Sequence, residues 1–194
     1  MGDPRKLRKK YETPRHPWQA SRIAAEKPLI VEYGLKNKKE IWKAQSLLRK
    51  FTSQAKELST LKTDHDKNEL KKLLIRLNKL GLLKENAERE DVLGLNIKNV
   101  LDRRLQTLLI KKGFAKTAKQ SRQLITHGHI SINNQKINVP SYLVNVDDEN
   151  KINYLENSPF INNEHPETIL IKQAFNNESK EEKKVLDKKK KRRQ

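Results

Sequence analysis

One stretch of the sequence, residues 100–144, restricts the fold more than any other. Apolar residues recur at helical spacing at its start, which predicts a helix from Asn96 to Gly113. A second, shorter helix is predicted to begin after Thr117, which has the side chain of an N-cap residue, and to end at Gly128. Glycine suits both ends because it adopts the positive φ that commonly follows the last turn of a helix.

Two short segments of alternating apolar and polar residues follow the second helix. Residues 130–132 and 137–139 each place their apolar side chains on one side, which predicts a half-buried β-hairpin. The asparagines at 133–134 fit its turn, because Asn tolerates the left-handed region. Residues 143–146 and 152–154 are expected to add strands to the same sheet.

Cations dominate this part of the chain. Between Lys98 and Asn145 the sequence has nine Lys and Arg side chains and one acid, Asp102, so nine minus one gives a net charge of +8. A surface that is only solvated usually mixes both signs, although a basic face of that ordinary kind stays an open alternative. The shortage of acids favours a polyanion as the partner.

The composition of the whole chain agrees with such a partner. Its 194 residues carry a formal net charge of +19, while apolar residues make up 34% and aromatic residues 5%. So little apolar material favours several small packed units joined by extended segments over one large core. The sequence has no Cys, which excludes disulfides and thiolate metal sites. No apolar run reaches the length of a membrane span, so we expect a soluble intracellular protein.

Residues 1–17 form a basic arm with no helical or strand period. Such a segment cannot bury enough apolar surface to fix its own backbone, so it is either a disordered tail or an arm that becomes ordered against RNA phosphates. Tyr11 and Trp18 are available to stack on bases or to pack on the body. A helix is expected from Trp18 to about Tyr33, with a kink or a break at Pro28.

Two further helical patterns follow, over residues 37–58 and 66–80. The polar segment between them, residues 60–68, is predicted to be a loop. His65 lies in this segment between two aspartates, but no second cluster of ligands completes a metal site, so we expect none. Residues 86–96 are expected to link this helical unit to the stretch described above.

The chain changes character after Asn145. From Asp147 to Phe175 the sequence has six acids and two lysines, so two minus six gives a net charge of −4. This segment is expected to close the sheet and then to extend over the surface or toward a protein partner. The last residues, 178–194, are rich in lysine. They are interpreted equally as a disordered solubilising tail or as a tail that threads RNA.

Several motifs, in this order, resemble one known family. Arg-Arg-Leu-Gln at 103–106, Gln-Ser-Arg-Gln at 120–123 and His-Gly-His-Ile at 127–130 resemble the RNA-binding domain of the small-subunit ribosomal protein four family. MGDPRKLRKKYETPRHPW at the start and EYGLKNKKEIWKAQSLLRKF further on are similar to its archaeal branch, which is close to the eukaryotic one. The resemblance covers most of the chain and does not extend to the lysine-rich tail.

Pattern and resemblance together imply an α+β fold. A basic N-terminal arm and a small helical domain precede the RNA-binding domain, which consists of two helices and a small antiparallel sheet, and an extended C-terminal tail follows. The expected boundaries are 1–17 for the arm, 18–95 for the helical domain, 96–157 for the RNA-binding domain and 158–194 for the C-terminal segment with its basic tail.

For function, the resemblance implies a structural constituent of the small ribosomal subunit that binds the small-subunit (16S-type) ribosomal RNA directly. It also implies a part in nucleating assembly of the subunit body and an influence on translational accuracy. The implied partners are neighbouring small-subunit proteins and messenger RNA near its entry site. The expected location is the cytoplasm, in the ribosome, and we expect no cofactor, no metal and no membrane partner.

Side chains from two regions are expected to contact the RNA. Cations on the helical face would meet phosphates, and the hairpin edge would meet phosphate or 2′-hydroxyl groups. The candidates in and beside the arm are Arg5, Lys6, Arg8, Lys9, Lys10, Arg15, His16 and Trp18. Those in the RNA-binding domain are Arg103, Arg104, Lys116, Lys119, Arg122, His127, His129 and Lys136.

The sequence shows no catalytic constellation, so we expect no enzymatic activity. His127 and His129 flank a glycine but have no third group to orient them, and the glycines form no phosphate-binding loop. Two alternatives stay open. One is an RNA-modifying enzyme or other RNA-binding factor that shares the RNA-binding module, and the other is a basic protein that compacts DNA. The enzyme is disfavoured because the acidic residues after the module, interrupted by prolines, leave too little chain for a catalytic core.

Overall fold

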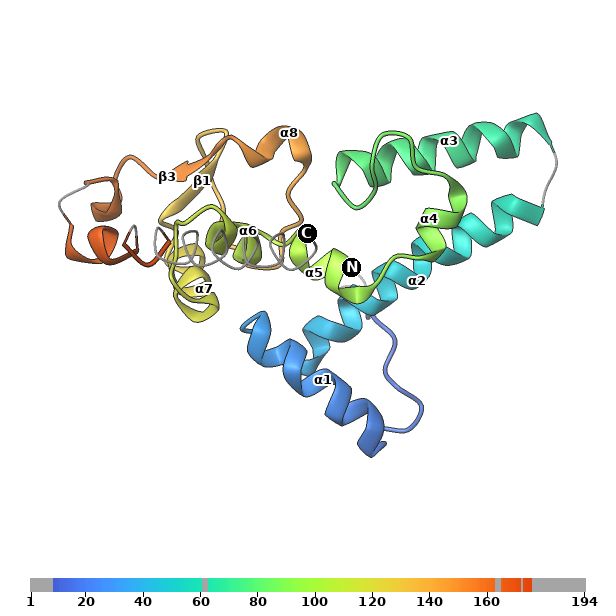
Figure 1. Ribbon diagram of the computed structural model, residues 1–194, viewed down its shortest axis with the longest axis horizontal. Coiled ribbons are helices and arrows are strands. Elements are labelled where there is room, and N and C mark those ends of the chain that lie inside the picture. The colour runs from blue at the N-terminus through green and yellow to red at the C-terminus, as the bar shows by residue number, and fades with distance from the viewer. Residues whose placement is uncertain (1–8, 61–62, 163–164, 172, 176–194) are drawn as a thin grey trace, which may run out of the picture. The chain divides into compact units, whose positions relative to one another are not determined.

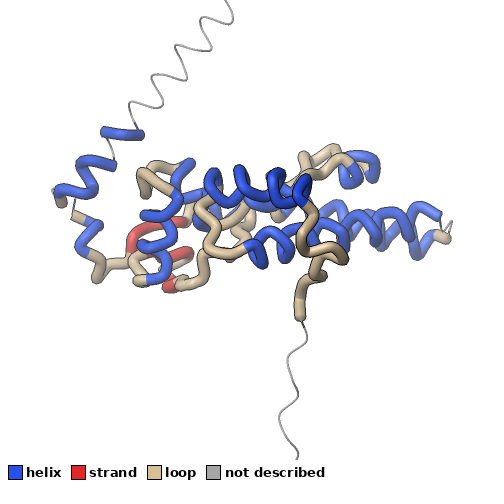
Figure 2. Tube along the Cα trace, turned by 90° about the horizontal axis from the view of Figure 1, so that it is seen from below, coloured by secondary structure: helices blue, strands red, loops and turns tan. Residues whose placement is uncertain are grey.

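The chain divides into two compact units. The first unit runs to Arg103 and includes residues 143–146, and the second comprises residues 104–142 and those from 147 onward. Helices make up most of both units, and the strands form one small sheet (Figure 2), as the predicted α+β fold requires. The computed structural model describes residues 9–60, 63–162, 165–171 and 173–175 (Figure 1).

The described residues of the first unit form helices around a central one. In chain order these are α1 (Ala20–Glu32), α2 (Lys38–Thr60), α3 (Asp64–Lys79), α4 (Arg89–Leu93) and α5 (Ile97–Asp102). All the others pack against α2, and α2 and α3 form a helical hairpin (Figure 1). The core that they enclose includes Ile41, Phe51, Leu77, Val92 and Leu101. Burying a Leu or Ile side chain in this way stabilises the fold by about 1.5–3 kcal/mol.

α1 runs through Pro28 as one helix, so the predicted break is absent, whereas the predicted kink stays a prediction. Pro28 has no amide to donate to the carbonyl of Ala24. Both residues are exposed, so water can satisfy that carbonyl oxygen instead. The helix therefore loses only one backbone hydrogen bond at Pro28, and the packing of α1 against α2 compensates for that loss.

α3 begins inside the segment where the sequence predicts a loop. Its first turn is fixed by a capping box, in which Thr63 Oγ1 accepts from the Asp66 amide and the Asp66 carboxylate accepts from the Thr63 amide. The predicted end of the helix is confirmed, because Gly81 has a φ of +67°. The expected link over residues 86–96 contains α4, whose Val92 is fully buried and so belongs to the core.

The second unit combines short helices with the sheet. Its elements are α6 (Leu105–Lys111), α7 (Ala118–Thr126), β1 (Ile130–Ile132), β2 (Gln135–Lys136), most of α8 (Val146–Glu149), β3 (Ile152–Tyr154) and the 3-10 helix η1 (Pro159–Ile161). α6 and α7 pack against each other. β1 lies in the middle of the antiparallel sheet, between β2 and β3.

The single helix predicted on both sides of Arg103 and Arg104 is divided into α5 and α6. Arg104 has an extended backbone, with φ −74° and ψ 143°. In the first unit, the Arg103 carbonyl accepts from the Val144 amide at 3.1 Å. In the second, the Leu105 amide donates to the Tyr142 carbonyl at 2.8 Å. These backbone bonds to a distant part of the chain replace helical ones, which ends the helix here.

The predicted hairpin is confirmed at its turn and corrected along its strands. Asn133 and Asn134 have φ values of 52° and 62°, the left-handed conformation expected there. All three residues of β1 are buried, not half-buried, because β1 is paired on both sides and Ser131 Oγ donates to the Asn153 carbonyl at 3.3 Å. The expected strand at 152–154 is present, whereas those at 137–139 and 143–146 are not.

The described residues after β3 form short helical elements. η1 is followed by helical turns over residues 166–171 and 173–175. Phe175 packs directly on Gly113, where a Cβ would lie 2.8 Å from the Phe175 ring. The two interpretations of the tail concern residues 178–194, which lie outside the described part of the chain. Among the helices that the structure describes, none is both long enough and apolar enough to cross a bilayer.

Candidate nucleic-acid interface

α7 has one buried face and one exposed face. The buried side chains are Ser121, Leu124 and Ile125. The exposed ones are Lys119, Gln123 and Thr126, which recur at i, i+4 and i+7. Arg122 lies at the edge of the exposed face and is half-buried. The amphipathic pattern read from the sequence therefore places Lys119 on the surface.

The rotation of α7 about its axis is fixed by hydrogen bonds at its start. Thr117 Oγ1 accepts from the Gln120 amide at 3.2 Å, which confirms the predicted cap. Gln120 Oε1 in turn accepts from the Lys116 amide at 2.8 Å. The buried Ser121 Oγ donates to the Gln106 carbonyl of α6 at 2.7 Å. Because the Ser121 bond holds the opposite side of α7 against α6, Lys119 stays in solvent.

Two more exposed lysines lie at the ends of this face. Lys116 directly precedes the α7 cap, and Lys136 ends β2. Gly128 has a φ of +75°, and the Lys136 side chain occupies the space that a side chain at residue 128 would need. This close approach brings the hairpin cation to the C-terminal end of α7, beside His127. Lys116, Lys119 and Lys136 are hereafter called the lysine cluster.

His127 and His129 stand with parallel rings, 5° apart in orientation and with centroids 6.3 Å apart. His127 is exposed, whereas His129 is half-buried and its Nδ1 lies 3.1 Å from Ser158 Oγ. The ring of Phe160 meets His129 edge to face, with centroids 5.0 Å apart. Partial burial lowers the pKa of His129, and the nearby charges of His127 and Lys136 lower it further.

We expect this lowered pKa of His129 to make the protein less stable in acid. The unfolded chain, with a His pKa of about 6.5, takes up the proton before the folded chain does, so acid favours unfolding. The contribution is present above the unfolded pKa and is lost as the pH falls through the folded pKa. Thermal unfolding of the full chain near neutral pH and in mild acid measures this, and His129→Gln should reduce the difference. An unchanged difference in that variant would contradict the assignment.

Arg103 is half-buried and Arg104 is buried, whereas both were expected to face RNA from the surface. In the first unit, an Arg103 Nη2–H donates to the Val144 carbonyl at 3.1 Å, and the guanidinium packs against Gly81. In the second unit, Arg104 is only 5% exposed. Both side chains contribute to the packing of the fold where the helix is divided, so we leave them out of the interface.

The described part of the arm packs along helices of the first unit. The Tyr11 ring lies 6.3 Å from that of Trp42, and the Glu12 amide donates to Ser46 Oγ at 2.9 Å. Arg22 of α1 donates to the Pro17 carbonyl at 2.7 Å. These contacts hold the described residues of the arm against the first unit, and they favour packing on the body, one of the two roles left open for Tyr11.

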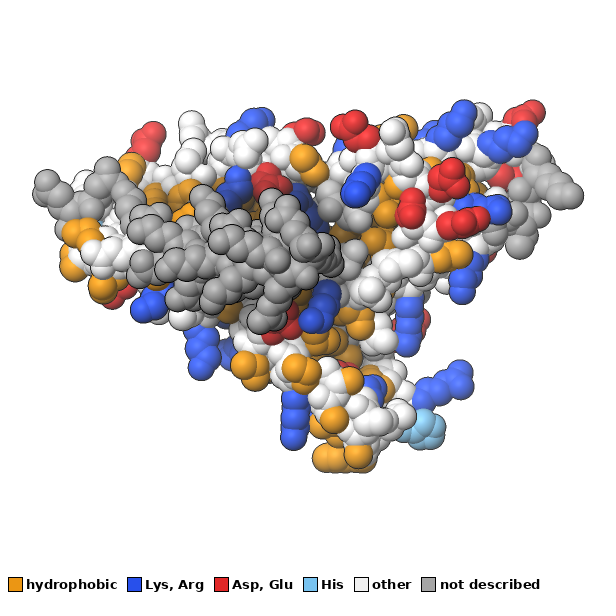
Figure 3. Space-filling view, viewed as in Figure 1, with side chains coloured by type: hydrophobic (Ala, Val, Ile, Leu, Met, Phe, Trp, Pro, Cys, Tyr) orange, Lys and Arg blue, Asp and Glu red, His pale blue; other side chains and the backbone are white. Residues whose placement is uncertain are grey.

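The cationic and aromatic candidates of this arm remain exposed where they are described. Trp18 is 90% exposed and stands near the start of α1, over which hydrophobic side chains gather (Figure 3). The other exposed candidates are Lys9, Lys10, Arg15 and His16. Three further candidates, Arg5, Lys6 and Arg8, lie outside the described residues.

Sequence reasoning missed the residues that surround the histidine pair. Ser158, Phe160 and Glu167 come from the segment that was expected to close the sheet and then to extend over the surface or toward a protein partner. They lie beside the end of α7 and His129. An aromatic residue at 160 in a polar segment interrupted by prolines was the one available signal. Within the described ranges, no group of His, Cys, Asp or Glu could hold a metal ion.

Sequence comparisons relate the chain to one family of known proteins. Residues 103–150 match the family model described as the S4 domain. The chain is 51% identical over 176 residues to small ribosomal subunit protein uS4 of Methanococcus aeolicus, covering 90% of this chain and 99% of that protein. It is 49% identical over 178 residues to the protein of the same name from Thermoplasma acidophilum, covering 90% and 87%. For that of Nanoarchaeum equitans, the identity is 47% over 173 residues, covering 88% and 96%.

Proposed function

The chain belongs to the small ribosomal subunit protein uS4 family, archaeal type, and from this premise we propose that it is a structural, non-catalytic constituent of the small ribosomal subunit. It binds the small-subunit ribosomal RNA directly and resides in the ribosome, in the cytoplasm. The family resemblance drawn from the sequence motifs is confirmed by the length and identity of the matches.

The single observation that carries direct RNA binding is the exposed face of α7 with the lysine cluster. Lys116, Lys119 and Lys136 are all exposed, and residues 104–142 contain no acid. Glu167 places one carboxylate beside Gln120, but cations predominate on this face, and such a face gains affinity for RNA by releasing counterions from phosphates. Arg122 and His127 lie beside these lysines and supply further donors.

The mode of recognition that fits this face is contact with the backbone of a folded RNA. The described residues of the interface lie on a short helix and a tight hairpin, which together make a compact basic wedge. Folded RNA is recognised mainly through its shape, its phosphates and its 2′-hydroxyl groups. The arm adds a second basic segment, where Trp18 is available to stack on a base.

The finer parts of the proposal rest on the family. We include nucleation of the assembly of the subunit body, contact with neighbouring small-subunit proteins, a place near the messenger RNA entry site and support of translational accuracy. Among these, the exposed apolar side chains of α1, such as Val31 at 82% exposure, support contact with another macromolecule.

A competition assay tests direct and selective binding to ribosomal RNA. The full chain, bound to labelled small-subunit ribosomal RNA of an archaeon, is challenged with unlabelled RNA or with duplex DNA of equal phosphate concentration. We expect the RNA to displace the label at a concentration at least about tenfold lower than the DNA, because shape-specific contacts add to the common phosphate contribution. Equal displacement would favour a general polyanion binder, such as a DNA-compacting protein.

A further inference from the structure

A small open pocket lies at the C-terminal end of α7, within the second unit. Its volume is about 260 Å³, and its lining includes Gln120, Gln123, His127, His129, Phe160 and Glu167. Pockets for drug-sized ligands usually measure about 300–1,000 Å³. This one therefore suits a group smaller than such a ligand. The exposed positions of Gln123, His127 and Glu167 leave it open to solvent.

The pocket walls are ring faces and ring edges. His127 and His129 are parallel, and Phe160 stands edge-on to His129 at 74°. Phe160 is itself held by His165, whose ring centroid lies 4.9 Å away, and by Tyr154 at 6.0 Å. With its pKa lowered, His129 presents a neutral ring near neutral pH. Walls of this kind bind a planar π-system by stacking.

The polar groups at the rim of the pocket favour a base over a phosphate as its ligand. Glu167 places a carboxylate at the pocket, and Gln120 Nε2 donates to its Oε2 at 3.2 Å. Gln120 is fixed in turn by the Lys116 amide, so the carboxylate is held in position. A carboxylate repels a phosphate but accepts from the amino group of a base, and the amide of Gln123 can both donate and accept.

We propose that this pocket holds one unpaired RNA base that carries an exocyclic amino group. The base stacks on the ring face of His127 and meets Phe160, whose ring stands nearly perpendicular to the histidine rings, edge to face. Its amino group donates to Glu167. Lys119 and Lys136, outside the pocket, meet the phosphates on either side of that nucleotide. The inference rests on the proposed RNA-binding function and adds to it a base-specific contact within an interface that otherwise reads only backbone.

Two oligonucleotides that differ by one base provide the test. Both are short single-stranded RNAs with the same phosphates; one is abasic throughout and the other carries a single central adenine. Their electrostatic attraction to the full chain is equal, so any difference in affinity comes from the base. We expect the adenine-bearing RNA to bind about 5–150-fold more tightly, the range expected from one stacked base. Cytosine and guanine should behave like adenine, and uracil should bind less tightly.

Variants assign the difference to the pocket. His127→Ala removes an exposed ring and should abolish the advantage of the base, whereas His65→Ala, which removes an exposed histidine of α3, should not. Glu167→Gln should remove the preference against uracil. Thermal unfolding of each variant shows whether the fold is kept.

Each contrary result has a distinct meaning. Equal affinity of the two oligonucleotides for the unmodified protein would overturn the pocket and leave the proposed function standing. Loss of the base advantage in Trp18→Ala, with no loss in His127→Ala, would place the stacked base on the arm and also overturn the pocket. Failure of the protein to bind these oligonucleotides and small-subunit ribosomal RNA alike at low salt would overturn the pocket and the proposed function together.

Discussion

Replacing Lys116, Lys119 and Lys136 together by Ala is expected to weaken binding to small-subunit ribosomal RNA by roughly 100-fold at about 0.1 M salt. Each lost phosphate contact should lower the slope of log K against log salt by about 0.7–0.9, so three should lower it by about 2–3. All three side chains are exposed, so the fold should survive the change. Filter binding across a series of salt concentrations measures both quantities.

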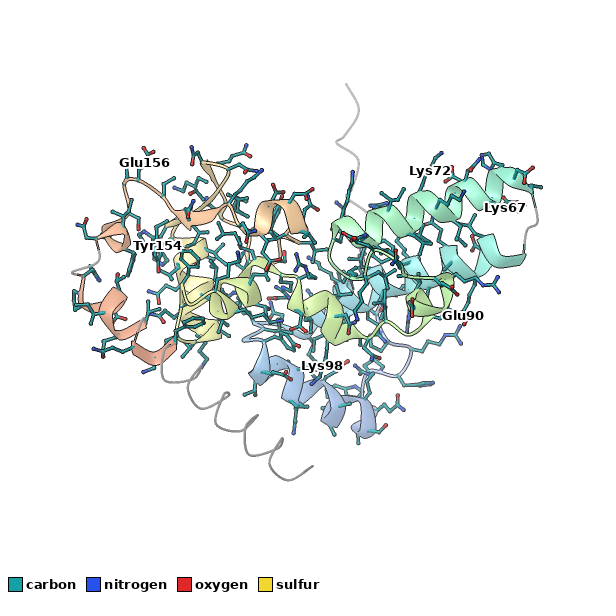
Figure 4. The ribbon with its side chains drawn as sticks, turned by 45° about the horizontal axis from the view of Figure 1, so that its top comes forward. Lys67, Lys72, Glu90, Lys98, Tyr154 and Glu156 are labelled. Atoms are coloured by element: carbon teal, nitrogen blue, oxygen red, sulfur yellow. The ribbon has the colours of Figure 1, made fainter. Side chains whose placement is uncertain are left out.

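A matched control removes the same charge from the first unit. Lys67, Lys72 and Lys98 (Figure 4) are also exposed, but each pairs with an acid, at 2.9 Å, 2.8 Å and 3.3 Å respectively. Because a paired cation contributes little field to a distant phosphate, their joint replacement by Ala should change the slope by less than about 1. If both triple variants lost affinity equally, the effect would come from net charge, and the lysine cluster would have no special role.

Local signals in the sequence were enough to predict where many helices begin or end. Gly81, Gly113 and Gly128 all take positive φ, and Thr117 caps α7 as predicted. Each of these signals lies within a few residues of the feature that it determines. The break between α5 and α6 has no such signal, since the apolar period continues across it. Its cause is a set of backbone bonds to Tyr142 and Val144, far along the chain.

The residues of the interface were also predictable only where a local sequence pattern determines their position. Lys119 and the exposed His127 follow from the period of α7 and from its end. The burial of Arg104 could not be predicted in this way. An arginine between apolar positions is expected to point outward, and only the tertiary fold shows that Arg104 is 5% exposed. Phe160 and Glu167 reach the pocket through the path of the chain after β3, which no local pattern encodes.

Glu26→Ala is expected to destabilise the first unit by about 2–3 kcal/mol, because it leaves the partly buried Arg22 guanidinium and the Trp42 N–H without their acceptor. Glu26 is 6% exposed, and its Oε1 accepts from Arg22 Nη1 at 2.6 Å and from Trp42 Nε1 at 3.2 Å. The change leaves the Arg22 guanidinium, whose side chain is 20% exposed, without its counterion. Because Arg22 also holds the Pro17 carbonyl, the arm should loosen as well.

Urea unfolding, followed by the fluorescence of Trp42 in a Trp18→Phe background, measures this loss, since the chain has only these two tryptophans. The free energy of unfolding of the Glu26→Gln variant should lie between that of the protein with Glu26 and that of the Glu26→Ala variant. The amide oxygen of Gln can still accept from Trp42, but the charge is lost. Glu32→Ala is the matched control: that acid pairs with Lys98 on the surface, so it should cost less than about 1 kcal/mol. A loss in Glu26→Ala no larger than in Glu32→Ala would mean that the Arg22–Glu26 pair does not hold α1 and the arm in place.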